Sequence, residues 1–361
     1  MKYFFFLFII LNIKKFTFQF IKTKPNSVIT IFSINDAYVP YISILIESII
    51  QNAKQKRPYE IFILTTKITL KNQEILKNQI KKDKRFSIEI IDVSKLIKNK
   101  KVKIYSHLSI ETYFRFFIFD LFPEVKKVLY LDSDLIINSD IADLYDINIE
   151  GKYLAAAKDI DIAGLIVFEK DKNEYIKKVI GYKGKDEYFQ AGVIIFNVQE
   201  IKRKISTDNL FKIAQKRRWN WMDQDVMNYV FKGNVLYLSQ QWNCIMNWKN
   251  LIGGMERMDI LKLAPKQLFN EYSEARKNPF IIHYAGNQKP WEYPSCDFSN
   301  YFWKYANKSI YINQIIIQNK KKRKKKKFRK MLIKYVKIIL IFSLFFFNLI
   351  LLCFKYFIYL R

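Results

Sequence analysis

The chain has 361 residues, half of them apolar, and a formal net charge of +29. The apolar content excludes a disordered chain, and about 300 residues remain after the unusual ends are set aside, enough for one large domain. Such a charge is typical of proteins that bind nucleic acid or a membrane surface. Cys244, Cys296 and Cys353 form neither a disulfide framework nor a metal-ligand spacing, which indicates a reducing compartment.

The chain begins with an apolar run, Tyr3 to Ile13, of signal-peptide length. Little charge precedes this run, Lys14 and Lys15 follow it, and it has no small-residue cleavage site, so it does not match a signal peptide. It is also too short to span a bilayer of about 30 Å. Residues 1–25 are therefore treated as a separate apolar and basic segment.

Residues 26–318 are predicted to form one α/β domain, because short β-branched runs alternate with helical patterns. This alternation predicts a parallel sheet with crossover helices. The segment between Asp161 and Tyr188 is polar and is predicted to be a loop. In chain order, the predicted elements are strand Val28–Ser33, helix Tyr41–Asn52, strands Ile61–Thr65 and Phe86–Asp92, buried helix Ile110–Phe122, strands Val128–Leu131, Tyr153–Ala157 and Ala191–Phe196, helix Asp223–Phe231 and strand Val235–Leu238.

The end of the chain combines a basic run with an apolar one. Residues 320–330 are basic except for Phe328 and carry about a third of the net charge. Ile338 to Phe354 is apolar apart from Ser343 and Asn348, which is the lower length limit for a spanning helix. We expect residues 319–337 to be a polybasic juxtamembrane segment and residues 338–361 a membrane-associated helix that either spans the bilayer or lies in its interface.

This tail also predicts a partner and a location. A polybasic segment beside an apolar helix binds anionic membrane lipid, each charge adding about 1 kcal/mol. The positive-inside rule places the basic run at the cytoplasmic face of a membrane, and the domain joined to it lies there too. The chain has no RNA-binding motif, so we expect no nucleic-acid partner.

A carboxylate pair, Asp132 and Asp134, follows the strand predicted at Val128–Leu131. In open α/β sheets ligands bind outside the carboxyl ends of the strands. Residues i and i+2 of a strand face the same side, so both carboxylates can converge on one divalent cation that bridges phosphate oxygens. The same pattern is also typical of a turn or a helix N-cap. The chain has nine Gly and no glycine-rich phosphate loop, so if this sheet binds a diphosphate, something other than a glycine nest must neutralise it.

A second group begins at His283, which follows the apolar run Pro279 to Ile282 and opens the segment HYAGNQKPW. An imidazole is a ligand for a borderline cation, Gly286 lets the backbone approach a phosphate, and Lys289 carries a compensating positive charge. The alternative for His283 is a histidine satisfied in the core. The sequence has only two histidines, and this one precedes Gly and Lys at short spacing.

Six blocks in this order resemble the family 8 glycosyltransferases, the retaining bacterial lipopolysaccharide galactosyl- and glucosyltransferases and their glycogenin relatives. The resemblance covers roughly Val28 to Trp291 and implies a single Rossmann-like nucleotide-diphospho-sugar transferase domain of the A type. The blocks are FSINDAY at 32–38, HLSIETYFR at 107–115, YLDSD at 130–134, QAGV at 190–193, DQD at 223–225 and the segment at 283–291.

The resemblance implies the site as well. It assigns Mn²⁺, with Mg²⁺ as the alternative, to Asp132, Asp134 and His283, and the donor's phosphates to Gly286 and Lys289. The uracil would stack on Tyr38, near Ser33 and Asn35. The residues implied around the transferred hexose are Arg115, Asp132, Gln190, Ala191, Asp223 and Gln224.

Two departures from the family pattern affect these assignments. Asn35 and Ala37 stand where relatives often carry an acidic residue and an Asn, which bears on base recognition. Gln190 replaces a common Asn, which bears on the choice between galactose and glucose. Gln224 is a poor nucleophile, so we expect retention by front-side attack rather than through a covalent intermediate. Without the family, the DQD block is typical of a helix N-cap followed by first-turn acids.

We therefore expect a metal-dependent retaining hexosyltransferase that uses a nucleotide diphosphate sugar, UDP-galactose or UDP-glucose. Its acceptor would be a lipopolysaccharide, another glycan or a glycolipid at the cytoplasmic membrane face. One alternative is a glycogenin-like self-glucosylating protein. The other is a catalytically inert membrane-bound binding protein, against which the intact Asp132, Asp134, His283 and Lys289 argue.

Overall fold

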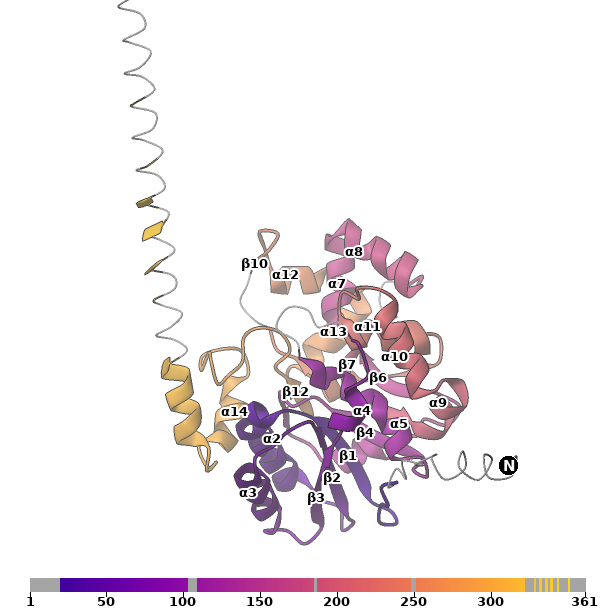
Figure 1. Cartoon of the computed structure of the whole chain (residues 1–361). Helices are drawn as coiled ribbons and strands as arrows, with labels where there is room; N and C mark the ends of the chain where they lie inside the picture. Colours follow the sequence, from indigo (N-terminus) through magenta and orange to yellow (C-terminus); the bar gives the residue numbers. More distant parts are fainter. Residues whose placement is uncertain are drawn as a thin grey trace, which may run out of the picture. The chain divides into compact units, whose positions relative to one another are not determined.

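A computed structural model describes residues 20–102, 109–184, 187–247 and 251–321, with single positions between 328 and 350. The chain divides into two compact units, Met1–Asn287 and Gln288–Arg361, and each is described by itself. In Figure 1 the first unit has its strands in the middle, with α2 (Val39–Asn52) and α3 (Leu70–Ile80) beside β1 to β3.

The core of the first unit is a mixed seven-stranded sheet in the order β3-β2-β1-β4-β7-β6-β8. The strands β3, β2, β1 and β4 are parallel, as predicted, but β7 is antiparallel to both β4 and β6. All seven predicted strands are confirmed, each within two residues at its ends. Their bounds are β1 Val28–Ser33, β2 Tyr59–Thr65, β3 Phe86–Asp92, β4 Lys127–Leu131, β6 Leu154–Lys158, β7 Phe189–Asn197 and β8 Val235–Leu238.

A second, three-stranded sheet positions the functional groups. Its order is β5-β12-β9, with β5 at Leu135–Ile137, β12 at Ile281–His283 and β9 at Cys244–Ile245. The strand β12 is antiparallel to β5, which pairs His283 with Leu135, and parallel to β9. This pairing brings the last residue of β12 next to the turn that leaves β4.

The predicted helices are confirmed, with one change of geometry. The segment predicted as helix 110–122 is buried, but it is a 3-10 helix, η2 (Ile110–Phe117), followed by one α-turn, α5 (Ile118–Leu121). Its aromatic side chains pack inward from successive turns. The tighter 3-10 winding places Arg115 close to the end of β4.

The prediction of a loop between Asp161 and Tyr188 is wrong. The segment contains α7 (Ile160–Phe168), α8 (Lys170–Tyr175) and a π-helical turn, η3 (Ile176–Ile180). Asp159 caps α7 by accepting a hydrogen bond from the Ile162 backbone N–H. Gly164, which reads as a helix breaker, allows close packing, because a Cβ there would lie 2.2 Å from the Ile260 carbonyl oxygen of α12 (Arg257–Lys262).

The remaining elements of the first unit connect and cover the two sheets. The helix α9 contacts β4 and β7, and α12 contacts α7. Their bounds are η1 Asp36–Tyr38, α4 Ser94–Ile97, α6 Ile141–Tyr145, α9 Val198–Lys204, α10 Thr207–Lys216, α11 Met222–Phe231, η4 Gln240–Asn243, β10 Leu251–Ile252, β11 Met255–Glu256 and α13 Lys266–Ala275.

The second unit contains α14 (Ser299–Ala306), whose Phe302 packs against Trp291 with ring centroids 5.4 Å apart. Within the described residues, no helix has the length and apolar character needed to cross a membrane. Most of the tail predicted at 338–361, and the apolar run at 3–13, lie outside the described residues.

Candidate active site

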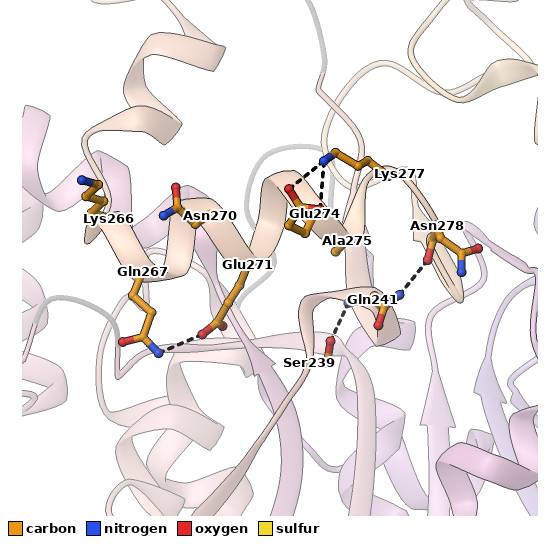
Figure 2. A pocket seen from close by; sticks show the side chains of 10 residues that line it. All are labelled: Ser239, Gln241, Lys266, Gln267, Asn270, Glu271, Glu274, Ala275, Lys277 and Asn278. Carbon is orange, nitrogen blue, oxygen red and sulfur yellow. Dashed lines mark hydrogen bonds and ion pairs between the residues drawn. The ribbon is translucent and has the colours of Figure 1, made fainter.

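A groove of about 820 Å³ runs along α13 and the start of η4 (Figure 2). Several of its polar side chains pair with one another: Gln267 Nε2 donates to Glu271 Oε1 at 3.0 Å, and Lys277 Nζ pairs with Glu274 at 2.7 Å. None of the residues predicted to carry chemistry lines this groove. The candidate active site therefore lies elsewhere in the first unit.

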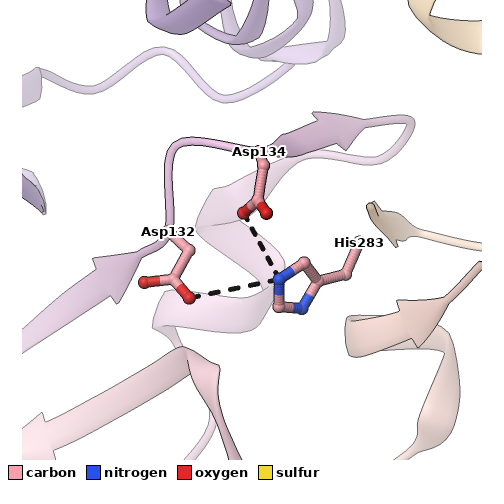
Figure 3. A group of neighbouring side chains, drawn as sticks. All are labelled: Asp132, Asp134 and His283. Atoms are coloured by element: carbon pink, nitrogen blue, oxygen red, sulfur yellow. Dashed lines mark ion pairs between the residues drawn. The ribbon is translucent and has the colours of Figure 1, made fainter. Parts of the chain in front are cut away.

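Asp132, Asp134 and His283 converge at one point (Figure 3). One ligand atom from each lies within 4.8 Å of the other two. His283 Nε2 is 3.3 Å from Asp134 Oδ1 and 4.0 Å from Asp132 Oδ2. His283 is almost completely buried, whereas the two carboxylates are partly exposed. Two carboxylates and an imidazole that face one accessible point are a suitable donor set for a divalent cation.

The two aspartates reach this point from a turn, not from a strand. Asp132 follows β4 and Asp134 precedes β5, so the expectation that they share a strand face is wrong in detail, although they do converge. The Asp132 N–H donates to Gly192 O at 2.8 Å, and the Tyr284 N–H donates to Asp134 O at 3.0 Å. These two backbone hydrogen bonds, one to β7 and one to the residue that follows β12, fix the backbone positions of the two aspartates.

Gly192 lies directly against two of the three converging side chains. A Cβ built at Gly192 would lie 2.3 Å from His283 Cε1 and 2.9 Å from Asp132 Oδ2. Any side chain there would displace the imidazole or the carboxylate. The glycine therefore lets the imidazole and the carboxylate lie directly against the backbone of β7, and the donor set that this packing brings together fits a bound cation.

Arg115 connects the metal-site aspartate to Asp223. Its guanidinium, almost completely buried, donates from Nη2 to Asp132 Oδ1 at 2.9 Å and from Nη1 to Ala191 O at 2.6 Å. Its Nε lies 3.0 Å from Asp223 Oδ2 but donates to Thr112 O, so the contact with Asp223 is an ion pair rather than a directed hydrogen bond. Burial raises the pKa of Asp223 to about 6, although Arg115 and the Thr112 hydroxyl oppose this.

Gln224 lies at the start of α11 with both ends of its amide engaged. Its Oε1 accepts from the Ala191 N–H at 2.9 Å, and its Nε2 donates to Asp159 Oδ2 at 3.0 Å. Burial, with the nearby Asp161 carboxylate, raises the pKa of Asp159 to about 7. Gln224 therefore links β7 to the cap of α7.

Gln190 faces the metal ligands from β7. Its Oε1 accepts from the Gly192 N–H at 2.5 Å and from Asn243 Nδ2 at 2.7 Å. Asn243 Oδ1 lies 2.9 Å from His283 Nδ1. The structure thus brings together eight of the predicted residues: Arg115, Asp132, Asp134, Gln190, Ala191, Asp223, Gln224 and His283.

The residues predicted to bind the base follow β1. Ser33 ends this strand, and the parallel pairing of β1 with β4 puts Ser33 at the same sheet edge as Asp132. Asn35 caps η1 by accepting from the Ala37 N–H at 3.1 Å. Tyr38 is partly exposed, with the edge of its ring against Tyr41. Base stacking on Tyr38 stays a prediction.

The two residues predicted to meet the phosphates fall in different units. Gly286 belongs to the first unit and has a φ of 89°, a left-handed conformation that favours glycine. Lys289 belongs to the second unit. It lies in a turn in which the Tyr293 N–H donates to Lys289 O at 2.8 Å. The roles of both residues toward a phosphate stay predictions.

Sequence reasoning missed Asp159 and Asn243. Asp159 lies just before the segment predicted to be a loop, and its contact with Gln224 spans 65 residues of chain. Asn243 ends the short 3-10 helix η4, and its bond to His283 spans 40 residues. The only local signal was the Asp159-x-x-Ile162 cap, which indicates a helix start and not a site.

Comparisons with known proteins match the part of the chain that carries these residues. The family model described as glycosyl transferase family 8 matches residues 29–295. A protein of Haemophilus influenzae named as a glycosyltransferase is 28% identical over 295 residues, which cover 78% of this chain and 79% of that protein. The lipopolysaccharide 1,2-glucosyltransferase of Escherichia coli K12 is 28% identical over 193 residues, 52% of each chain.

Solved structures share the fold. The bifunctional glycosyltransferase WbbM, in its apo form, superposes with a TM-score of 0.74 and 29% identity over 82% of this chain, which spans about half (52%) of WbbM. The galactosyltransferase LgtC, in complex with donor and acceptor sugar analogs, gives a TM-score of 0.63 at 21% identity over 78% of this chain and 96% of LgtC. The α/β fold with its mixed central sheet is therefore the A-type glycosyltransferase fold.

Proposed function

Since the chain belongs to glycosyl transferase family 8, and is therefore a glycosyltransferase, we propose that it is a metal-dependent retaining hexosyltransferase. Its donor is a UDP-hexose, UDP-galactose or UDP-glucose, and its acceptor a lipopolysaccharide, another glycan or a glycolipid. The observation that carries this proposal is the convergence of Asp132, Asp134 and His283, which Gly192 allows by leaving room for the imidazole and the Asp132 carboxylate beside β7.

These three residues would hold Mn²⁺, or Mg²⁺ in its place, because they offer two carboxylates and an imidazole within one ion's reach. A bound divalent cation stabilises the negative charge that develops on a departing nucleotide diphosphate. The chain's own residues prepare this site in advance. Arg115 holds Asp132 through Oδ1, so the second oxygen of that carboxylate keeps its direction toward Asp134 and His283.

The hexose would lie among Arg115, Asp223 and Gln190. Gln190 Oε1 already accepts two hydrogen bonds, whereas within the described residues its Nε2 meets no acceptor. This amide would therefore donate to a sugar hydroxyl. Asp223 would accept from a second hydroxyl, because burial next to Arg115 leaves that carboxyl with capacity beyond the Thr112 bond.

Retention would follow from front-side attack, in which the leaving phosphate oxygen takes the proton of the acceptor hydroxyl. Gln224 is a poor nucleophile, and its amide is engaged at both ends. The next carboxylate, Asp225, already accepts from Tyr188 at 2.6 Å, Tyr175 at 2.7 Å and the Trp221 N–H at 2.8 Å. Gln224 would support the positive charge that develops at the anomeric carbon.

The uracil base and the phosphates of the donor would be bound by residues other than those around the hexose. Tyr38 would stack on the uracil near Ser33 and Asn35, while Gly286 and Lys289 would meet the diphosphate. The partly exposed ring of Tyr38 and the left-handed backbone of Gly286 support this arrangement.

The location is part of the proposal. We place residues 26–318, as the catalytic domain, at the cytoplasmic face of a membrane, with the basic residues at 320–330 on anionic lipid and residues 338–361 associated with the membrane. The charge and apolar pattern of the sequence support this placement. It also fits the glycolipid class of acceptor.

The test is donor hydrolysis across a panel of nucleotide sugars with Mn²⁺. We expect turnover of a UDP-hexose that stops in excess chelator and falls by two or more orders of magnitude in Asp134→Ala. Asp259→Ala, which removes an exposed carboxylate of α12, is the control and should keep the wild-type rate. Full turnover in chelator would refute metal dependence, and label retained on the protein's own tyrosine would indicate self-glucosylation.

A further inference from the structure

A chain of hydrogen bonds runs from β7 to Nδ1 of His283, the ring nitrogen that does not face the two carboxylates. It starts at the Gly192 N–H, which donates to Gln190 Oε1 at 2.5 Å, and continues through Asn243 Nδ2, which donates to the same oxygen at 2.7 Å. It ends at Asn243 Oδ1, 2.9 Å from His283 Nδ1. The chain links β7, η4 and β12, and it ends on the proposed metal ligand.

The direction of every bond in this chain follows from its first member. A backbone N–H can only donate, so the Gln190 atom that it meets is the carbonyl oxygen. The Asn243 atom that meets this oxygen must then be the NH₂ group, which turns the carbonyl oxygen of Asn243 toward the imidazole. An oxygen can only accept, so His283 carries its proton on Nδ1.

We infer that Asn243 is a positioning residue, which locks His283 in the tautomer with the proton on Nδ1 and turns the lone pair of Nε2 toward Asp132 and Asp134. This inference deepens the proposed function and rests on the metal site proposed there. A histidine that ligates a metal commonly donates its other N–H to a fixed acceptor, which sets both the tautomer and the ring orientation. Here the acceptor is an amide whose own orientation is set by the backbone of β7.

Burial of these residues strengthens the preference for one tautomer of His283. Gln190, Asn243 and His283 are 9%, 1% and 2% exposed, so bulk water cannot readily replace a lost partner. A reversed Asn243 amide would place its oxygen against Gln190 Oε1 and its NH₂ group against the imidazole, which would lose two hydrogen bonds in the interior. The pairing of Ile245 with His283 in β9 and β12 keeps Asn243, two residues earlier, next to the ring.

The direct test is the ¹⁵N spectrum of the imidazole in the metal-free protein. The sequence has two histidines, so the variant His107→Gln leaves His283 as the only signal in a histidine-labelled sample. At alkaline pH, long-range ¹H–¹⁵N correlations distinguish the protonated ring nitrogen from the other. We expect the proton on Nδ1. A ring with its proton on Nε2 in the otherwise wild-type protein would overturn the inference.

Three variants separate positioning from structure. Asn243→Leu removes the acceptor and should give a mixture of tautomers, whereas Asn243→Asp keeps an acceptor and should keep the proton on Nδ1. Asn228→Leu is the matched control, because Asn228 is a buried amide that also bonds to β7 but not to His283. It should lower the unfolding midpoint and leave the tautomer unchanged. If Asn243→Leu does not fold, the ¹⁵N spectra of His107→Gln and Asn243→Asp still show which ring nitrogen of His283 carries the proton.

Binding of Mn²⁺ alone, followed by electron paramagnetic resonance, gives the second readout. We expect Asn243→Leu to weaken Mn²⁺ binding about 10- to 100-fold, the usual effect of losing such a partner, and Asn243→Asp to retain it. Equal affinity in Asn243→Leu and wild type would overturn the positioning role. A fixed Nδ1 tautomer that Asn243→Leu releases, in a protein that binds no Mn²⁺, would uphold the lock and refute the metal site.

Discussion

At the scale of single residues, the charges of the site meet at Asp132. Its Oδ1 receives the buried guanidinium of Arg115 at 2.9 Å, and its Oδ2 faces His283 at 4.0 Å. A carboxylate tethered on one side by a buried cation cannot rotate freely, so its second oxygen stays where an ion would bind. The fixed orientation of the Asp132 carboxylate therefore depends on Arg115, a residue that would not contact the ion itself.

Gly192→Ala is expected to destroy the cation site. The new Cβ would lie 2.3 Å from His283 Cε1, and the imidazole can move away only by leaving its place beside Asp134 and Asn243. We predict a loss of Mn²⁺ binding of at least 100-fold, measured by calorimetry. Donor hydrolysis should fall in parallel.

Gly164→Ala is the control for that experiment. Its Cβ would meet the Ile260 carbonyl oxygen at 2.2 Å, an equally close contact but between α7 and α12. This variant should lose stability by about 1–3 kcal/mol, as overpacked interiors do, with Mn²⁺ affinity unchanged. Equal loss of Mn²⁺ affinity in both glycine variants would show that the effect of Gly192→Ala is general instability.

Asp223→Asn is expected to change how stability depends on pH. Burial raises the pKa of Asp223 from 3.8 to about 6, so the folded protein holds this proton more tightly than the unfolded chain. The contribution of Asp223 is therefore fully present below pH 3.8 and is lost as the pH rises through 6. Two pKa units correspond to about 3 kcal/mol.

The asparagine variant lacks this titration, so its stability relative to wild type should increase by about 2–2.5 kcal/mol from pH 4 to pH 7. Urea unfolding at four pH values in that range measures the difference. A constant difference between the two proteins would mean that Arg115 keeps Asp223 ionised throughout.

At the scale of elements, β1 and β3 have the bounds predicted from sequence, because a run rich in β-branched residues between turn signals identifies a strand. The helix α7 was missed, because Gly164 interrupts its pattern and its packing against α12 decides the structure instead. The strands β5, β9 and β12 have two or three residues each, too few for any periodicity. Only long-range pairing makes them strands.

The same distinction holds for the site. Asp132, Asp134 and His283 could be predicted, because each follows a recognisable apolar run and two carboxylates with an imidazole have a known chemistry. The partners behind them could not. Asn243 is one amide among many in an Asn-rich chain, and its contact with His283 depends on the register of β9 against β12.

Arg257→Met is expected to weaken the attachment of α12 to α7. The Arg257 guanidinium is buried, pairs with Asp161 and donates to Met246 O at 2.8 Å. Its removal leaves a half-buried carboxylate and a buried carbonyl without this partner, which should cost about 2–4 kcal/mol in urea unfolding.

Lys262→Met, on the same helix, is the matched control. Its ion pair with Asp259 has both side chains more than half exposed, so its loss should change stability by less than about 1 kcal/mol. A similar small effect for Arg257→Met would mean that methionine packing replaces the buried pair.

At the scale of the whole molecule, about a third of the net charge lies in one run near the end of the given sequence, residues 320–330. Truncation after Gln318 should release the protein from vesicles that contain phosphatidylserine while donor hydrolysis persists, because the run and the apolar residues after it provide the attraction. Vesicle sedimentation with and without added salt measures this.

A full-length variant with every basic residue of 320–330 changed to Gln separates the two contributions. It should bind vesicles more weakly than wild type and lose the salt dependence, since only the apolar part remains. If the truncated protein still sediments with vesicles, the apolar run at residues 3–13 becomes the leading candidate for the anchor.

The three-stranded sheet has a consequence for synthesis on the ribosome. All seven strands of the large sheet are made by Leu238, but β5 and β9 pair only with β12, which ends at His283. At roughly 5–20 residues per second, His283 follows β5 by about 7 to 30 seconds. During that interval the nascent chain has both aspartates but lacks His283. Binding of the proposed cation at all three ligands can therefore stabilise only a chain that extends through His283.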